Sequence, residues 1–255
     1  MSLALVTGAS SGLGKEFVQL LAAEGSDLVI VARNEKNLRD LAAEMERRFL
    51  VQVEVLPADL TMADEVEKVA LRLQDTENPV DLLINNAGMG LGQEFIGGSI
   101  AQELTAANLM VNALLVLTHA AVGAMVARGS GQIINVSSIT SMTVQGTYSA
   151  HKAWVKVFTE GLADDLAGTG VNITAVMPGL MHTEFHQRVH VDAGQWAEWM
   201  FIKPRKVARA ALDGVRAGKV LVIPSMLYKA TYVALKFAPR ALVRKYAGSK
   251  RSGRL

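Results

Sequence analysis

Short apolar runs rich in β-branched residues alternate with longer amphipathic segments along the chain, and this alternation constrains the fold more than any other feature. Seven runs have the composition of strands that are buried on both faces, as in a parallel sheet. They are Leu3–Thr7, Leu28–Ala32, Gln52–Leu56, Asp81–Asn85, Gln132–Ser137, Asn172–Met177 and Val220–Ile223. The segments between them, such as Asn37–Arg48 and Ala63–Leu73, have the spacing of amphipathic helices. This pattern predicts an α/β fold: a doubly wound, seven-stranded parallel sheet with helices on both faces.

Composition limits the class of protein. With 255 residues, 50% of them hydrophobic and 20% charged, the chain has the profile of an ordered globular protein, and we expect a single domain over residues 1–255. The absence of cysteine excludes disulfides, thiolate metal sites and a cysteine nucleophile, and it fits the cytoplasm, where we expect the protein. We expect neither a membrane-spanning helix, which needs about 20 apolar residues, nor a signal peptide.

A glycine-rich turn, TGASSGLG at residues 7–14, follows the first predicted strand directly and precedes a helix. Glycines let the backbone approach a pyrophosphate closely, and the N–H groups of a helix N-terminus attract its charge. The alternative is an ordinary tight turn, since the spacing GxxxGxG differs from the familiar GxGxxG. The flanking strand and helix favour a dinucleotide site, and therefore a Rossmann fold. The candidate phosphate-binding residues are Gly8, Ser10, Ser11, Gly12, Leu13 and Gly14.

Three further turns lie where the second, third and fourth predicted strands end. An acidic residue after the second strand binds the ribose hydroxyl of NAD, whereas an arginine accommodates the 2′-phosphate of NADP. Here Arg33 occupies that place, so we expect NADP (NADPH); the alternative is that Arg33 is a solvated loop charge. The turn after the third strand is placed to meet adenine, and the turn after the fourth to shape the cofactor floor. Their candidate residues are Asp59, Leu60, Asn86, Ala87 and Gly88.

The residues with reactive chemistry are Ser138, Tyr148 and Lys152. Tyr148 and Lys152 are four residues apart in a helical stretch, so they share one helix face. A tyrosine has a pKa near 10, and a neighbouring ammonium is expected to lower it and make the phenol a usable proton donor or acceptor. Ser138, at the end of the fifth strand, is placed to hold a substrate carbonyl oxygen.

The spacing YxxxK is weak evidence alone, because it also occurs at Tyr232/Lys236 and Tyr246/Lys250. Only the first instance follows a serine pair at the end of a predicted strand and precedes a strand that ends in Pro178-Gly179. The lysines of the other two are predicted to be solvated on C-terminal helices.

Together these motifs resemble the short-chain dehydrogenase/reductase family over residues 2–223, and among its members an NADP-preferring carbonyl or 3-oxoacyl reductase. The matching segments are TGASSGLG, ADL, NNAG, the Asn in LMVNALLVLT, SS, YSAHK and PGLMHT. The resemblance implies a catalytic tetrad of Asn112, Ser138, Tyr148 and Lys152. In it Tyr148 exchanges a proton with the substrate oxygen, Ser138 orients that oxygen, and Asn112 helps to hold a water-linked proton relay.

The resemblance also assigns cofactor contacts and exposes two departures from the family. Tyr148 and Lys152 would contact the nicotinamide ribose, and Thr183, after Pro178 and Gly179, would hold the carboxamide. The connection from Ser138 to Tyr148 is ten residues, about three shorter than usual, which predicts an altered pocket rather than lost catalysis. The chain also continues past the last strand as a helical extension, residues 224–255, predicted to remodel a subunit contact of a homo-oligomer, either a dimer or a tetramer.

Residues 184–203 are predicted to form a substrate lid, and their aromatic residues favour a lipophilic ketone or 3-oxoacyl substrate; the equal alternative is that these aromatics only pack the lid itself. His182, His186 and His190 have the spacing of a metal-binding helix face, but the stretch begins as a loop, so we expect no metal.

The predicted activity is NADPH-dependent carbonyl reduction. One alternative is an NAD(P)-dependent alcohol or hydroxysteroid dehydrogenase that works in the oxidative direction. The other is a non-catalytic dinucleotide-sensing protein.

The formal net charge of +2 conceals an uneven distribution. No acidic residue follows Asp213, whereas ten basic residues do, so the first 213 residues carry a net charge of −8. The simpler interpretation is a solvated helical surface with a frayed end. The alternative is contact with an anionic partner, either a membrane surface or an acidic acyl carrier. The mild basicity, with a pI near 8.8, does not indicate nucleic acid.

Overall fold

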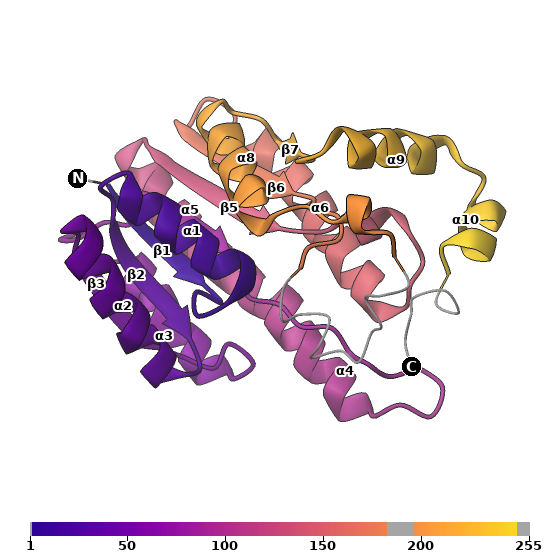
Figure 1. Cartoon of the computed structure of the whole chain (residues 1–255). Coiled ribbons are helices and arrows are strands. Elements are labelled where there is room, and N and C mark those ends of the chain that lie inside the picture. The colour runs from indigo at the N-terminus through magenta and orange to yellow at the C-terminus, as the bar shows by residue number, and fades with distance from the viewer. Residues whose placement is uncertain (1, 183–195, 249–255) are drawn as a thin grey trace.

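The computed structural model describes residues 2–182 and 196–248, and its elements are built around a seven-stranded parallel sheet (Figure 1). The strand order is β3-β2-β1-β4-β5-β6-β7, which reverses its direction of winding between β1 and β4. The strands are β1 (Leu3–Thr7), β2 (Asp27–Ala32), β3 (Val53–Pro57), β4 (Leu82–Asn85), β5 (Gly131–Val136), β6 (Val171–Val176) and β7 (Leu221–Val222). This confirms the doubly wound α/β sheet, and each predicted strand end lies within one residue of the observed one.

Helices cover both faces of the sheet and enclose two apolar cores. On one face α1 (Gly12–Ala23), α2 (Glu35–Phe49) and α8 (Pro204–Arg216) pack over the sheet, and α9 (Met226–Phe237) adds Tyr228 to the same core. On the other face lie α3 (Ala63–Leu73), α5 (Ala113–Arg128) and α6 (Thr147–Asp165). Within residues 2–182 and 196–248 the other helices are α4 (Ile100–Ala107), α10 (Arg240–Tyr246), the π-helical turn η1 (Asn108–Asn112) and the 3₁₀ turns η2 (Ile139–Met142) and η4 (Glu198–Met200).

The run Ile100–Arg128, which joins α4, η1 and α5, is long and apolar enough to cross a membrane, with a mean hydropathy of 2.0 in its most apolar window. This differs from the expectation that no such run exists. In the structure 44% of that window is buried, and α5 packs against α3, β4 and β5. Burial against the sheet accounts for the apolar character of α5.

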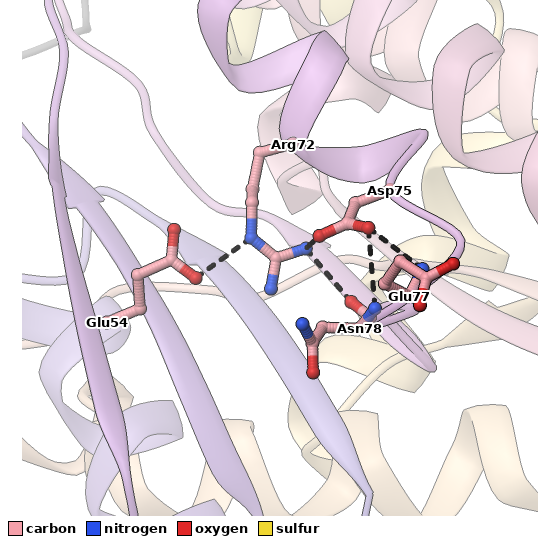
Figure 2. Close-up of polar contacts among 5 residues, drawn as sticks. All are labelled: Glu54, Arg72, Asp75, Glu77 and Asn78. Carbon is pink, nitrogen blue, oxygen red and sulfur yellow. Dashed lines mark hydrogen bonds and ion pairs between the residues drawn. The ribbon is translucent and has the colours of Figure 1, made fainter.

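A partly buried arginine joins the edge strand β3 to the helix that follows it (Figure 2). Arg72, near the end of α3, donates from Nε to Glu54 Oε2 on β3 at 2.8 Å and from Nη1 to the Asn78 carbonyl at 3.0 Å. Its Nη1 also lies 3.6 Å from Asp75 Oδ2, and the Arg72 side chain is only 14% exposed. Most of the Arg72 side chain is withdrawn from water, whereas Glu54 and Asp75 stay partly exposed, so we expect the group to make a modest contribution to stability.

We predict that Arg72→Ala lowers the free energy of unfolding by about 1–3 kcal/mol, because it leaves the Asn78 carbonyl and the Glu54 carboxylate without their donor. The matched control is Arg39→Ala: Arg39 pairs with Glu35 within α2, and its side chain is 69% exposed. The control should change stability by no more than about 0.5 kcal/mol. Urea denaturation of both variants measures the difference, and equal effects would contradict a structural role for the Arg72 group.

Candidate active site

The glycine-rich turn between β1 and α1 has a backbone that side chains would obstruct. Gly8 and Gly12 have positive φ values of 64° and 52°. A Cβ on Gly14 would lie 2.1 Å from the Gly8 carbonyl oxygen, so the third glycine lets the first turn of α1 pack on the turn itself. The first turn of α1, which follows the N-cap residue Ser11, contains no acidic residue. The N-terminus of α1 is therefore suited to a phosphate group.

Residues at the end of β4 hold this turn in place. Asn86 Nδ2 donates to the carbonyls of Thr7 and Gly8 at 2.9 and 3.2 Å, and the backbone N–H groups of Asn86 and Ala87 donate to Thr7 Oγ1 at 2.9 and 3.0 Å. The Asn86 side chain therefore stabilises the conformation of the glycine-rich turn. Gly88 lies next to the reactive group, because a Cβ built on it would be 3.6 Å from Lys152 Nζ.

Arg33 and Asp59 line one cavity at the carboxyl ends of β2 and β3. This open cavity has a volume of about 630 Å³, and Pro57, Ala58 and Lys68 also line it. Asp59 Oδ1 accepts from Thr61 N and Thr61 Oγ1 at 3.0 and 2.8 Å, so the carboxylate is fixed in its own turn. Leu60 is buried. Arg33 is exposed and lines this hollow together with the carboxylates of Asp64 and Glu65, and the hollow is of the size an adenosine moiety requires.

Ser138, Tyr148 and Lys152 are brought together at the end of β5 and the start of α6. The Ser138 and Tyr148 hydroxyls are hydrogen-bonded to each other, and Lys152 Nζ lies 5.9 Å from the centre of the Tyr148 ring. Lys152 is 5% exposed and donates from Nζ to the Val136 carbonyl at 2.7 Å. Ser137 supports this arrangement, since its Oγ donates to the Lys152 carbonyl at 2.7 Å.

The expected lowering of the Tyr148 pKa is not found in this structure. Burial raises the pKa of Tyr148 to about 12, and the bond with Ser138 only partly opposes the rise. Burial lowers the pKa of Lys152 to about 8. Both shifts arise because the two groups are removed from water, which disfavours the phenolate and the ammonium. Lys152 Nζ donates to the Val136 carbonyl rather than to the Tyr148 hydroxyl.

Asn112 ends the π-helical turn η1 that joins α4 to α5, and η1 packs against α6. Its Nδ2 donates to Asn108 Oδ1 at 2.8 Å, and its side chain is exposed. Such turns interrupt the regular pairing of backbone groups and often mark functional sites. The structure therefore places Asn112 on an element adjacent to the other three residues, without a described contact to them.

The segment after β6 completes the edge of the site. The N–H of Ile139, next to Ser138, donates to the Pro178 carbonyl at 2.9 Å, which joins the end of β5 to the Pro178-Gly179 turn. His182 stacks on Phe201 with ring centroids 3.9 Å apart and pairs with Glu198 at 2.8 Å. The predicted carboxamide ligand Thr183, the lid residues 184–195 and two of the three spaced histidines, His186 and His190, lie outside the described residues. Of the lid, residues 196–203 are described.

Comparison with known proteins identifies the family. A family model described as short chain dehydrogenase matches residues 2–193. The chain belongs to the short-chain dehydrogenase family. It is thus an NAD(P)-dependent oxidoreductase with a Rossmann fold.

Three relatives of this short-chain dehydrogenase illustrate the similarity. An uncharacterised oxidoreductase of Staphylococcus aureus (strain MW2) is 33% identical over 71% of this chain and 78% of its own. A short-chain dehydrogenase from Sphingobium yanoikuyae, solved in complex with NADPH, is 32% identical, covers 95% of both chains and has a TM-score of 0.85. A bulky-bulky ketone specific alcohol dehydrogenase from Comamonas testosteroni is 26% identical, with a TM-score of 0.80 over 96% of this chain and 98% of its own. The two solved structures leave only 5% and 4% of this chain unmatched, which is fewer residues than the C-terminal extension 224–255 contains. Both therefore match part of that extension.

Tyr228 on α9 is a residue of this dehydrogenase that the sequence motifs did not single out. Its hydroxyl accepts from Leu180 N at 3.1 Å and donates to the Met200 carbonyl at 3.0 Å, so one side chain joins both sides of the predicted lid. Its ring packs on Gly179, where a Cβ would lie 2.0 Å from ring carbons. Only its place within the aromatic C-terminal helix hinted at such a role, because the contact spans 48 residues of sequence.

We predict that Tyr228→Phe raises the KM for a ketone substrate about three- to tenfold, while kcat and NADPH affinity change less than twofold. The variant keeps the ring on Gly179 but leaves the Leu180 N–H and the Met200 carbonyl unpaired, which loosens the lid rather than the catalytic residues. Steady-state kinetics separate the two constants. Tyr232→Phe, one turn further along α9, is the control; an equal KM change in both variants would contradict the positioning role of Tyr228.

Proposed function

We propose that this short-chain dehydrogenase reduces the carbonyl group of a lipophilic ketone or 3-oxoacyl compound with NADPH, and that residues 1–255 act as one cytoplasmic domain. The observation that carries the proposal is the hydrogen-bonded pair of Ser138 and Tyr148, with Lys152 beside it, at the carboxyl edge of the sheet. This edge is where ligands bind in open α/β sheets. The presence of all three reactive groups also argues against a purely dinucleotide-sensing role.

The residues around the glycine-rich turn fit NADPH. The Gly8–Gly14 turn and the N-terminus of α1 suit the pyrophosphate, the cavity beside Arg33 has room for the adenosine, and Arg33 itself is assigned to the 2′-phosphate. The relative from Sphingobium yanoikuyae was solved with NADPH. Lys152 lies beside Gly88 and is assigned to the nicotinamide ribose, with Pro178, Gly179 and Thr183 at the nicotinamide.

NADPH, when bound, supplies the hydride that reduces the carbonyl carbon. Ser138 holds the substrate oxygen, and Tyr148 donates a proton to it as negative charge develops. With a pKa raised to about 12, the Tyr148 phenol is protonated at neutral pH, which is the form that carbonyl reduction needs. Alcohol oxidation needs the phenolate of the same residue instead. Lys152 and Asn112 are assigned to the return of a proton to Tyr148.

The described part of the lid supports a lipophilic substrate. His182 and Phe201 form a stacked pair next to η4, and Trp199 on η4 is 71% exposed. The relative from Comamonas testosteroni is named for bulky ketones. We also propose a homo-oligomer, because α5 exposes Leu115, Val116 and Val126.

We predict that Tyr148→Phe lowers kcat for reduction of a bulky aromatic ketone by about 10²- to 10⁴-fold, because it removes only the proton donor. NADPH binding, measured by quenching of protein fluorescence, should stay within threefold. Tyr232→Phe is the control, since Tyr232 has the same YxxxK spacing without the site around it. The reaction is followed in both directions by NADPH absorbance. A Tyr148→Phe variant with undiminished kcat would overturn the proposed function.

We predict that Arg33→Ala raises the KM for NADPH about 10- to 100-fold and leaves the KM for NADH within threefold, as expected for loss of one charge-assisted phosphate contact. Lys68→Ala is the comparison, because Lys68 lines the same cavity but donates to the Pro57 carbonyl at 3.2 Å. It should change the ratio of the two KM values less than threefold. A wild-type preference for NADH would contradict the assignment of Arg33.

A further inference from the structure

The C-terminal helices α9 and α10 form an arm at the β7 end of the sheet, opposite β3 (Figure 1). The inner side of the arm is anchored: Tyr228 and Val243 are 5% and 2% exposed, and Leu227 and Tyr232 pack against the core. Arg240 Nη1 donates to the Met142 carbonyl at 3.3 Å, and Val144 N donates to the Ala247 carbonyl at 3.2 Å. The arm is therefore a fixed part of the molecule.

The outer side of the arm is also apolar, which a solvated helix does not require. Met226, Ala230, Val233 and Phe237 follow one another at helical spacing on α9, and all four are exposed. Met226 and Phe237 are each 77% exposed, and α10 adds Leu242 at 49% and Tyr246 at 58%. One apolar side of α9 packs against the core, and the other remains exposed to solvent, which is typical of an interaction surface.

Exposed cations lie on the same two helices as this outer apolar stripe. The exposed basic residues of the arm are Lys229, Lys236, Arg240, Arg244 and Lys245. No acidic residue follows Asp213 in the sequence, so no carboxylate of the arm neutralises them. Exposed apolar and aromatic side chains among uncompensated cations are the composition of helices that lie in the interface of an anionic bilayer.

A second exposed apolar cluster on the molecule lacks these cations. Phe95, Ile96, Ile100 and Leu104, before and within α4, are 58–91% exposed, but no lysine or arginine occurs between Arg72 and Arg128. The combination of apolar stripe and positive charge is thus specific to the arm rather than a general property of the surface.

We propose that the outer face of the arm docks on an anionic lipid surface, with Met226, Val233 and Phe237 in the acyl boundary and the flanking cations at lipid phosphates. A second copy of the chain fits this surface poorly, because a two-fold symmetric contact through it would bring the five cations of one copy close to the same five of the other, and they would repel each other. The arm contacts the 138–148 connection through Met142 and Val144, so docking places the mouth of the proposed ketone site beside the bilayer. A lipophilic substrate dissolved in the membrane then has a short path to the site.

The test is sedimentation of the full-length protein with vesicles of phosphatidylcholine alone and of phosphatidylcholine with 30% phosphatidylglycerol. We expect binding to the anionic vesicles that is at least tenfold stronger than to the neutral ones and that falls at high salt. Met226→Ser/Phe237→Ser and Lys229→Gln/Lys236→Gln should each lower the partition coefficient about tenfold or more. Melting temperature and NADPH-dependent reduction of a water-soluble ketone check that the variants remain folded.

The matched controls are Ile96→Ser, which removes an apolar side chain that is 91% exposed, and Lys36→Gln, which removes a distant exposed cation on α2. Both should bind anionic vesicles as the wild type does. Equal binding to neutral vesicles, no binding at all, or equal losses in the controls would overturn the proposal. Binding to a soluble acidic protein but not to vesicles would overturn it also. Vesicle binding needs no turnover, so its failure is distinguishable from failure of the reductase function.

Discussion

The structure depends on the hydrogen bonds that join the ends of β1 and β4, the two strands between which the sheet reverses its winding. Thr7, only 1% exposed, donates from Oγ1 to the Ile84 carbonyl and accepts from the backbone of Asn86 and Ala87. The Asn86 amide returns two bonds to Thr7 and Gly8. Because Thr7 is withdrawn from water, its hydroxyl and the backbone groups around it need these partners, which fixes the conformation of the turn. The crevice at this switch point is where open α/β sheets bind ligands.

From this point an ordered path runs along the carboxyl edge of the sheet. Gly88 brings the β4 turn beside Lys152, and Lys152 is bonded to the end of β5 through the Val136 carbonyl. The next residue pair, Ile139 and Pro178, joins β5 to the segment after β6. Tyr228 then joins that segment to α9. The C-terminal extension is therefore connected to the glycine-rich turn by a series of short contacts along this edge.

The sequence predicted the parts of this path that are local. Strands buried on both faces have an apolar signature, so their bounds were found to within one residue, and α3 was predicted at Ala63–Leu73 as observed. The glycine turn and the YxxxK pair are short motifs with a fixed spacing. The hydrogen bonds of Tyr228 to Leu180 and of the Asn86 side chain to Thr7 were not predicted. Their partners are 48 and 79 residues away, and neither residue type is unusual in its place. Hydropathy likewise did not reveal that α9 buries one apolar side and exposes another.

The pKa of Tyr148 shows why a motif does not determine the electrostatics of its own residues. Proximity to an ammonium lowers the pKa of a phenol, but burial of the same pair raises the pKa of the phenol and lowers that of the amine. Here burial dominates, since Tyr148 is raised to about 12 and Lys152 lowered to about 8. Both shifts favour the uncharged forms of the two side chains, which the sequence motif alone did not indicate.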